Sequence, residues 1–111
     1  MQALIQRYRS FEEAVWEAEG IRIDFLRQIA EIDGKEIIFT KKEFELLKHF
    51  IENVGIVLTR ENLIDAVWGQ DYYGDTRTID TFVKQLRKKL GEKSARIQSV
   101  YGVGYKFEVE A

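Results

Sequence analysis

The segment Thr76-Arg-Thr-Ile-Asp-Thr-Phe-Val-Lys-Gln-Leu-Arg-Lys-Lys-Leu90 decides the fold, because as a helix it has two faces of opposite character. Its apolar residues recur three or four positions apart, at Ile79, Phe82, Val83, Leu86 and Leu90. The opposite side carries Arg77, Thr81, Lys84 and Lys88. One face therefore suits a protein core and the other an anion, although an ordinary solvated helix also presents basic residues outwards.

The charge of the chain is divided along the sequence. The 111 residues carry a formal net charge of −2, from 17 basic and 19 acidic residues, and the pI is about 5.5. Residues 77–107 hold eight of the basic residues and two of the acidic ones, so this part carries +6 and the remainder carries −8. Because the local field governs binding, this basic end fits a nucleic-acid partner better than the overall charge does.

Length and composition favour one compact domain in the cytoplasm. A chain of 111 residues can bury roughly two thirds of the surface of its unfolded state. It contains no cysteine, so it has neither disulfides nor a thiolate metal site. No apolar run approaches the roughly 20 residues of a membrane span, and residues 1–20 lack the apolar core of a signal peptide. We therefore expect a soluble, cytoplasmic protein with no membrane partner.

The N-terminal third predicts a small antiparallel sheet. Residues 1–19 show a loosely helical spacing of apolar residues and are the least defined part of the chain. Apolar and charged residues then alternate over Ile21–Phe25. The segments 28–32 and 35–39 flank Asp33-Gly34, a dipeptide favoured where both turn residues need a positive φ. We therefore expect a tight hairpin in this sheet.

Two more helices are predicted from their capping residues. Thr40 and Glu43 have the spacing of a capping box, in which each side chain accepts from the other residue's amide. Thr59 can cap a second helix, which Gly69 stops. The loop 70–75 then leads into the basic helix. Two short helices joined in this way form a helix-turn-helix.

The last part of the chain predicts a hairpin. Apolar and charged residues alternate over Tyr105–Val109, and Gly102 and Gly104 allow a tight reversal after the segment 97–101. A hairpin that follows a helix-turn-helix is a wing. The expected fold class is therefore α+β, a winged helix-turn-helix with an N-terminal antiparallel sheet, three helices and a C-terminal β-hairpin wing.

Six short motifs occur along this sequence, and their order is more specific than any one of them alone. They are Thr40-Lys-Lys-Glu-Phe-Glu-Leu-Leu47, Thr59-Arg-Glu-Asn-Leu63, Ala66-Val-Trp-Gly69, Arg77-Thr-Ile-Asp80, Leu86-Arg-Lys-Lys-Leu90 and Val100-Tyr-Gly-Val-Gly-Tyr-Lys-Phe107. Together they resemble the winged-helix output domain of OmpR/PhoB-type response regulators, over about Ile21 to Val109. The resemblance implies a winged-helix DNA-binding domain at residues 20–111. It also implies that residues 1–19 are a linker and the remnant of a preceding receiver domain.

The resemblance also implies which residues contact double-stranded DNA. In the family the basic helix enters the major groove. The residues here that match its contacts are Arg77, Thr78, Phe82, Lys84, Gln85 and Lys88. Trp68 matches an aromatic residue that rests against the DNA backbone, and Ser99 and Tyr101 match contacts of the wing. Thr81 joins the candidate set through its place on the basic face.

The chemistry of these side chains agrees with such a role. Arg77, Lys84 and Lys88 can neutralise phosphates, and Thr78 can hydrogen-bond one. Gln85 has the donor and acceptor pair that reads N6 and N7 of adenine in the major groove. The expectation is that phosphate contacts position the domain and that Gln85 contributes the base readout.

Three positions keep alternative interpretations. Trp68 is explained equally well by core packing beside Val67. Phe82 stands where relatives often have a polar residue, so it serves the core or lies near a sugar. Tyr101 stands where an arginine often enters the minor groove, and tyrosine lacks the charge that a narrow A·T groove attracts. The alternative for Tyr101 is packing against the sheet.

Catalysis and cofactor binding are not expected. The sequence has no cysteine, a single His49 on a predicted helix, and no set of His, Asp and Glu at metal-ligand spacing. The expected function is sequence-specific duplex DNA binding by the transcription-regulating output domain of a two-component response regulator. The alternative is a winged helix used for protein contact. The resemblance further implies tandem half-sites and a loop, Gly69 to Asp75, that faces RNA polymerase.

Overall fold

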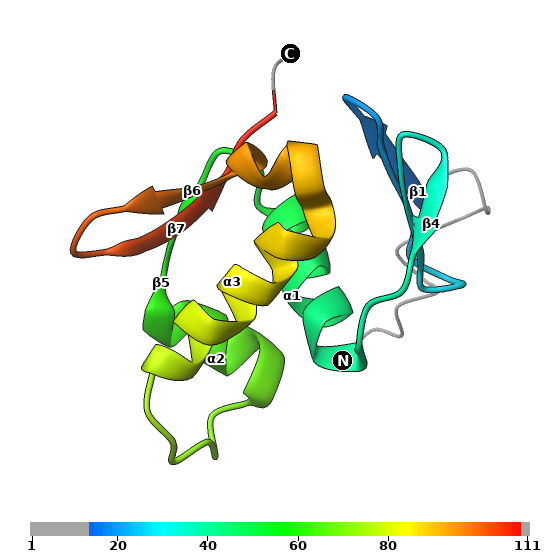
Figure 1. Ribbon diagram of the computed structural model, residues 1–111. Coiled ribbons are helices and arrows are strands. Elements are labelled where there is room, and N and C mark those ends of the chain that lie inside the picture. Colours follow the sequence, from blue (N-terminus) through cyan, green and yellow to red (C-terminus); the bar gives the residue numbers. More distant parts are fainter. Residues whose placement is uncertain (1–13, 110–111) are drawn as a thin grey trace. The chain divides into compact units, whose positions relative to one another are not determined.

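The computed structural model describes residues 14–109, which divide after Ile38 into two units (Figure 1). The first unit is a sheet. The second contains three helices and a second sheet. No helix in the described range is long and apolar enough to cross a membrane.

The first unit is a four-stranded antiparallel sheet with its strands in sequence order. Its strands are β1 (Val15–Ala18), β2 (Ile21–Asp24), β3 (Ile29–Ile32) and β4 (Lys35–Ile37). Ile21 and Ile23 are buried and lie opposite Ile32 and Ala30 on β3, as the alternation predicts. Asp33 and Gly34 both have positive φ, 52° and 83°, which confirms the predicted tight hairpin.

Strand β1 corrects the expectation of helical spacing within residues 1–19. Val15–Ala18 pairs with β2, and the turn between the strands places both Glu19 and Gly20 at positive φ. The antiparallel pairing provides a backbone partner that a weak helical pattern cannot outweigh. The remaining part of that expectation concerns residues 1–13, which lie outside the described residues.

The second unit contains the three predicted helices. They are α1 (Lys41–Glu52), α2 (Arg60–Trp68) and α3 (Arg77–Leu90). The capping box is confirmed, since Thr40 Oγ1 accepts from the amide of Glu43 and Glu43 Oε1 accepts from the amide of Thr40. Thr59 Oγ1 accepts from the amide of Asn62, which confirms the cap of α2. Each such cap stabilises a helix by about 1 kcal/mol.

The apolar stripe of α3 forms much of the core of this unit. Ile79, Val83, Leu86 and Leu90 are buried, and α1 and α2 pack against the same helix. Each fully buried side chain of this size contributes about 1.5 to 3 kcal/mol. Phe82 departs from the expected stripe because it is only half-buried.

The wing belongs to a three-stranded sheet with the strand order β5-β7-β6. Its strands are β5 (Val57–Thr59), β6 (Ile97–Val100) and β7 (Gly104–Phe107). The sequence predicted the hairpin β6-β7 but not β5. The short 3₁₀ helix η2 (Gly91–Arg96) connects α3 to β6. A Cβ atom at Gly104 would collide with the carbonyl oxygen of Leu58, so the pairing of β5 with β7 requires glycine there. The structure confirms the α+β winged helix-turn-helix.

Candidate nucleic-acid interface

The outward face of α3 is a polar surface, which we call the exposed face of α3. Its residues are Arg77, Thr81, Lys84, Gln85 and Lys88, all exposed. Over residues 14–109, neither Lys84 nor Lys88 forms an ion pair. Their charges are therefore available to an external anion.

Arg77 begins this face and is paired locally. Its guanidinium lies 2.7 Å from Asp75 Oδ2 and is 84% exposed, and Asp75 Oδ1 accepts from the Arg77 amide at 2.8 Å. The hydrogen bond from the Arg77 side chain lowers the pKa of Asp75. An exposed pair of this kind is weak, so Arg77 can exchange Asp75 for a phosphate. The sequence analysis named Asp75 only as the end of a loop and did not predict its bonds to Arg77, although an Asp just before a helix is a typical signal of a helix N-terminus.

Thr78 is less accessible than the sequence suggested. It is half-buried, and its Oγ1 lies 2.8 Å from the Tyr72 hydroxyl. The sequence analysis gave no role to Tyr72. A phosphate bound by Thr78 would therefore share or replace this hydrogen bond.

Trp68 ends α2 and lies in an aromatic cluster. Its ring centroid is 4.8 Å from that of Phe82, edge to face, and 5.9 Å from that of Tyr72. Lys42 Nζ lies 5.5 Å from the same ring and donates to the Val67 carbonyl at 2.9 Å. Trp68 is only half-buried, so it packs in this cluster and still presents part of its indole to solvent.

Lys89 is turned inward, to α1. Its Nζ lies 2.5 Å from Glu43 Oε1, and the Glu43 side chain is almost fully buried. Burial alone would raise the pKa of Glu43, but the hydrogen bonds from Lys89 and Thr40 outweigh it and lower the pKa. This pair fixes the C-terminal half of α3 to α1. Lys89 does not add to the charge available to DNA.

Arg87 connects α3 to the wing. Its Nη2 donates to the Ile97 carbonyl at 2.7 Å and to Ser99 Oγ at 3.0 Å, and its guanidinium lies over the Tyr105 ring. Ser99, a predicted wing contact, is exposed but already holds this bond. The sequence analysis gave no such role to Arg87, whose partners lie 10 and 12 residues away.

Asp80 joins α2, α3 and the wing. Its Oδ1 accepts from Arg60 Nε at 2.9 Å and from the Tyr105 hydroxyl at 2.5 Å. Burial raises the pKa of Asp80, but the hydrogen bonds from Tyr105 and Arg60 lower it overall. Burial and the bond to Asp80 in turn raise the pKa of Tyr105. These three side chains fix the orientation of α3 relative to β7.

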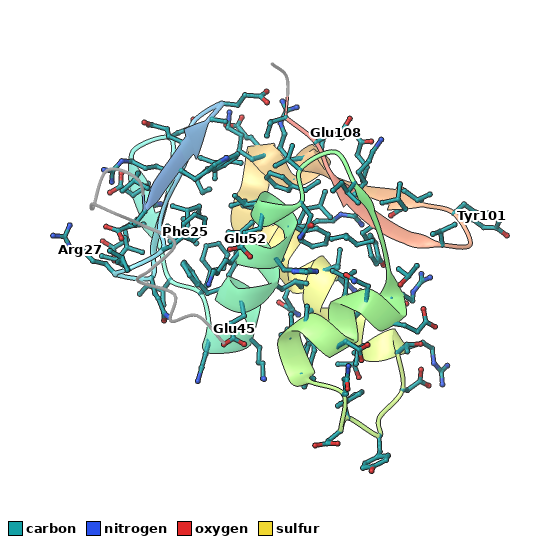
Figure 2. All side chains as sticks on the ribbon, turned by 180° about the vertical axis from the view of Figure 1, so that it is seen from behind. Phe25, Arg27, Glu45, Glu52, Tyr101 and Glu108 are labelled. Atoms are coloured by element: carbon teal, nitrogen blue, oxygen red, sulfur yellow. The ribbon has the colours of Figure 1, made fainter. Side chains whose placement is uncertain are left out.

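The tip of the wing is apolar. Tyr101 lies at the far end of the β6-β7 hairpin (Figure 2) and is fully exposed, so the alternative that it packs against the sheet is wrong. Val103, also at the tip, is 43% exposed. Lys106, on β7, lies 3.6 Å from Glu108. The tip therefore offers a ring, a hydroxyl and an aliphatic group, without a cation.

Within residues 14–109, no group of three or more His, Cys, Asp and Glu residues could hold a metal ion. His49 is partly exposed on α1, and its Nε2 lies 2.9 Å from Asn62 Oδ1.

A comparison with known protein families shows to which family this chain belongs. Residues 34–107, about two thirds of the chain, match the family described as "Transcriptional regulatory protein, C terminal". The chain belongs to this family. More specifically, it is the C-terminal domain of an OmpR/PhoB-type response regulator, here called the output domain, and the family is one of transcription regulators, not enzymes.

Similar sequences are found in sensory regulators. The output domain is 45% identical over 100 residues to the sensory transduction protein RegX3 of Mycolicibacterium smegmatis. The aligned region covers 87% of this chain and 44% of that protein. It is 47% identical over 83 residues to the transcriptional regulatory protein SrrA of Staphylococcus aureus, covering 71% of this chain and 34% of that protein. The output domain thus spans less than half the length of these relatives.

Solved structures share the fold. Response regulator DrrB of Thermotoga maritima, an OmpR/PhoB homologue, superposes with a TM-score of 0.79 at 32% identity, covering 94% of this chain and 47% of that one. The DNA-binding domain of Klebsiella pneumoniae RstA, in complex with the RstA box, gives a TM-score of 0.76 at 25% identity, covering 85% of this chain and 96% of that one.

Proposed function

We propose that the output domain binds duplex DNA in a sequence-specific way, with α3 in the major groove. The exposed face of α3 carries this proposal, because it presents unpaired Lys84 and Lys88 beside the free amide of Gln85. The similar RstA domain was solved with its DNA box, and the similar AdeR domain with an intercistronic region, which supports the same partner here.

The candidate residues divide into positioning and readout. Lys84 and Lys88 neutralise phosphates, and Arg77 joins them by leaving Asp75. Gln85 reads an adenine through N6 and N7. Thr81 lies one turn before it on the same face. Neutral contacts come from Thr78, the exposed part of Trp68, Ser99 and Tyr101.

The full-length protein extends this function. The relatives RegX3 and SrrA are more than twice as long as the matched region. We propose that residues 1–19 lead from a receiver domain, although they also contain strand β1, which pairs with β2. We further propose that the domain acts in the cytoplasm. Two copies would bind neighbouring half-sites in tandem. Footprinting with increasing protein would show one protected half-site first and then both.

The loop between α2 and α3 is the proposed contact with RNA polymerase. Asp71 and Asp75 are exposed, and Tyr73 is 95% exposed, whereas Tyr72 is held by Thr78 and Trp68. Tyr73→Ala should lower transcription activated in vitro by the full-length regulator and leave DNA affinity unchanged. Equal transcription by the two proteins would contradict this part of the proposal.

Selection from a random duplex pool tests the central proposal. The wild-type chain should enrich a short motif that contains an A·T pair, and Gln85→Ala should enrich a motif relaxed at one position. Binding without any enrichment would reject specificity. The absence of binding at low salt would favour the alternative of a protein-contact module.

A further inference from the structure

A depression of about 520 Å³ lies beside the exposed face of α3, wholly within the second unit. Thr40 and the first residues of α1 form one side, and α3 forms the other. The lining residues are Thr40, Lys41, Lys42, Glu43, Thr81, Phe82 and Gln85. The depression shares Thr81 and Gln85 with the exposed face of α3, so it continues the proposed DNA interface.

The floor of the depression is apolar and its rim is basic. The accessible walls are mostly carbon, and Phe82 is held in place by its edge-to-face contact with Trp68. Lys41, on the rim, is exposed and forms no ion pair in the described part of the chain. Lys42 already donates to the Val67 carbonyl. Lys41 is therefore the cation that is free to bind a ligand.

Glu43 also lines the depression, and a bare carboxylate would repel an anionic ligand. Its Oε1, however, accepts from Lys89 and from the Thr40 amide. These bonds lower its pKa and neutralise its field locally. The depression therefore combines an apolar floor with a cationic rim and a compensated carboxylate.

We propose that this depression receives the sugar-phosphate backbone of the strand that borders the major groove, with a deoxyribose against Phe82 and a phosphate at Lys41. The proposal rests on the proposed DNA binding and adds a recognition of sugar type. The C2′ methylene of deoxyribose suits an apolar floor. A ribose 2′-hydroxyl placed against Phe82 would lose its water, and the nearly all-carbon accessible lining offers it little to bond to in exchange.

Single ribonucleotide substitutions along a selected duplex test the sugar contact. At one or two adjacent positions of one strand, a ribose should weaken binding of the wild-type chain by about threefold to tenfold. Phe82→Ala should remove this penalty and bind the all-deoxy duplex more weakly. Phe82→Leu keeps an apolar floor and should keep the penalty, which guards against a folding defect in Phe82→Ala. A duplex that tolerates ribose everywhere would overturn the proposal.

Variants of α1 test the phosphate contact. Lys41→Gln should reduce the slope of log K against log salt by about one. Lys48→Gln, on the same helix but outside this depression, should leave the slope unchanged. An unchanged slope for Lys41→Gln would contradict the proposed phosphate contact at Lys41. If these variants fail while Lys84→Ala still weakens binding, the further inference is wrong and DNA binding stands. If the wild-type chain binds no duplex, the proposed function itself fails.

Discussion

Helix α3 and the wing are both candidates for DNA contact, but they offer different chemistry. The exposed face of α3 carries unpaired lysines and an amide, whereas the wing ends in Tyr101 and Val103 and its Lys106 lies beside Glu108. We therefore propose that attraction to phosphate and the reading of bases are concentrated on the helix. The wing can add shape complementarity and neutral contacts.

The helix itself is divided in a similar way. Asp80, Arg87 and Lys89 bind α2, the wing and α1, while Lys84, Gln85 and Lys88 remain exposed. The inward group holds the outward group in a fixed geometry before DNA arrives. Such preorganisation reduces the entropy lost on binding.

The largest expected effect is the dependence of binding on salt. If four to six phosphates are neutralised per domain, log K should fall with log salt at a slope of about −4 to −5. Affinity would then drop by about 250-fold to 1,000-fold between 50 and 200 mM salt. Titrations by fluorescence anisotropy measure the slope. A slope near zero would remove the electrostatic role assigned to α3.

Lys89→Met separates anchoring from binding. Removing the ammonium leaves the buried Glu43 carboxylate without its main partner, which should destabilise the domain by about 2 to 4 kcal/mol in urea unfolding. Lys88→Met, one position earlier but exposed, should change the free energy of unfolding by less than about 0.5 kcal/mol. Equal effects on stability would contradict the division of α3 into inward and outward groups.

Acid should also lower the free energy of unfolding, because it weakens the bonds of Glu43 and Asp80 that hold α3 to the rest of the domain. The pKa values of Glu43 and Asp80 are lowered in the folded state, so the unfolded chain takes up protons first as the pH falls. Their stabilisation is complete above the unfolded-state pKa values, near 4, and is lost as the pH falls through the lower folded values. Urea unfolding at a series of pH values should show this decline, and it should be smaller in Lys89→Met.

Two neighbouring residues of α3 should differ in how they affect binding. Gln85→Ala should cost about 1 to 3 kcal/mol on the preferred site and relax one base position. Lys84→Ala should weaken binding to every sequence about equally and make the salt slope shallower by about one. Affinities measured on the preferred site and on single-base variants would compare them. Full base preference in Gln85→Ala would assign the readout to another residue.

The smallest expected effect is at the wing. Tyr101→Arg should tighten binding by less than tenfold and add a preference for A·T pairs flanking the half-site, because a guanidinium gains from the negative potential of a narrow minor groove. Duplexes that differ only in their flanks would measure this. If affinity and flank preference stay the same, the wing tip does not enter the groove.

Local chemistry is what made much of the fold predictable. Thr40 and Thr59 cap helices through bonds to residues three positions away, and Asp33-Gly34 forms its turn by itself. Strand β5 could not be predicted, because Val57 pairs with Lys106, which is distant in the sequence. Short strands with such remote partners leave little trace in a local pattern.

The candidate site likewise has features that the local sequence predicts and features that depend on remote residues. The exposure of Thr81, Lys84 and Lys88 followed from helical periodicity, and the structure confirms it. The inward bonds of Arg87 and Lys89 depend on a backbone carbonyl 10 residues away and a carboxylate 46 residues away, so the count of basic residues overstated the charge on the surface. Which of the exposed residues contact DNA stays a prediction.

On α3, the residues that bind the rest of the domain differ from those that are exposed, and this difference also bears on how such regulators diversify. Thr81, Lys84, Gln85 and Lys88 are exposed, so replacing them changes few contacts with the rest of the domain. Surface substitutions of this kind usually shift stability by less than about 0.5 kcal/mol. A duplicated gene could therefore acquire a new operator through a few changes on this face while Asp80, Arg87 and Lys89 stay constant. Paralogues within one genome could diverge in their targets without passing through unstable ancestors.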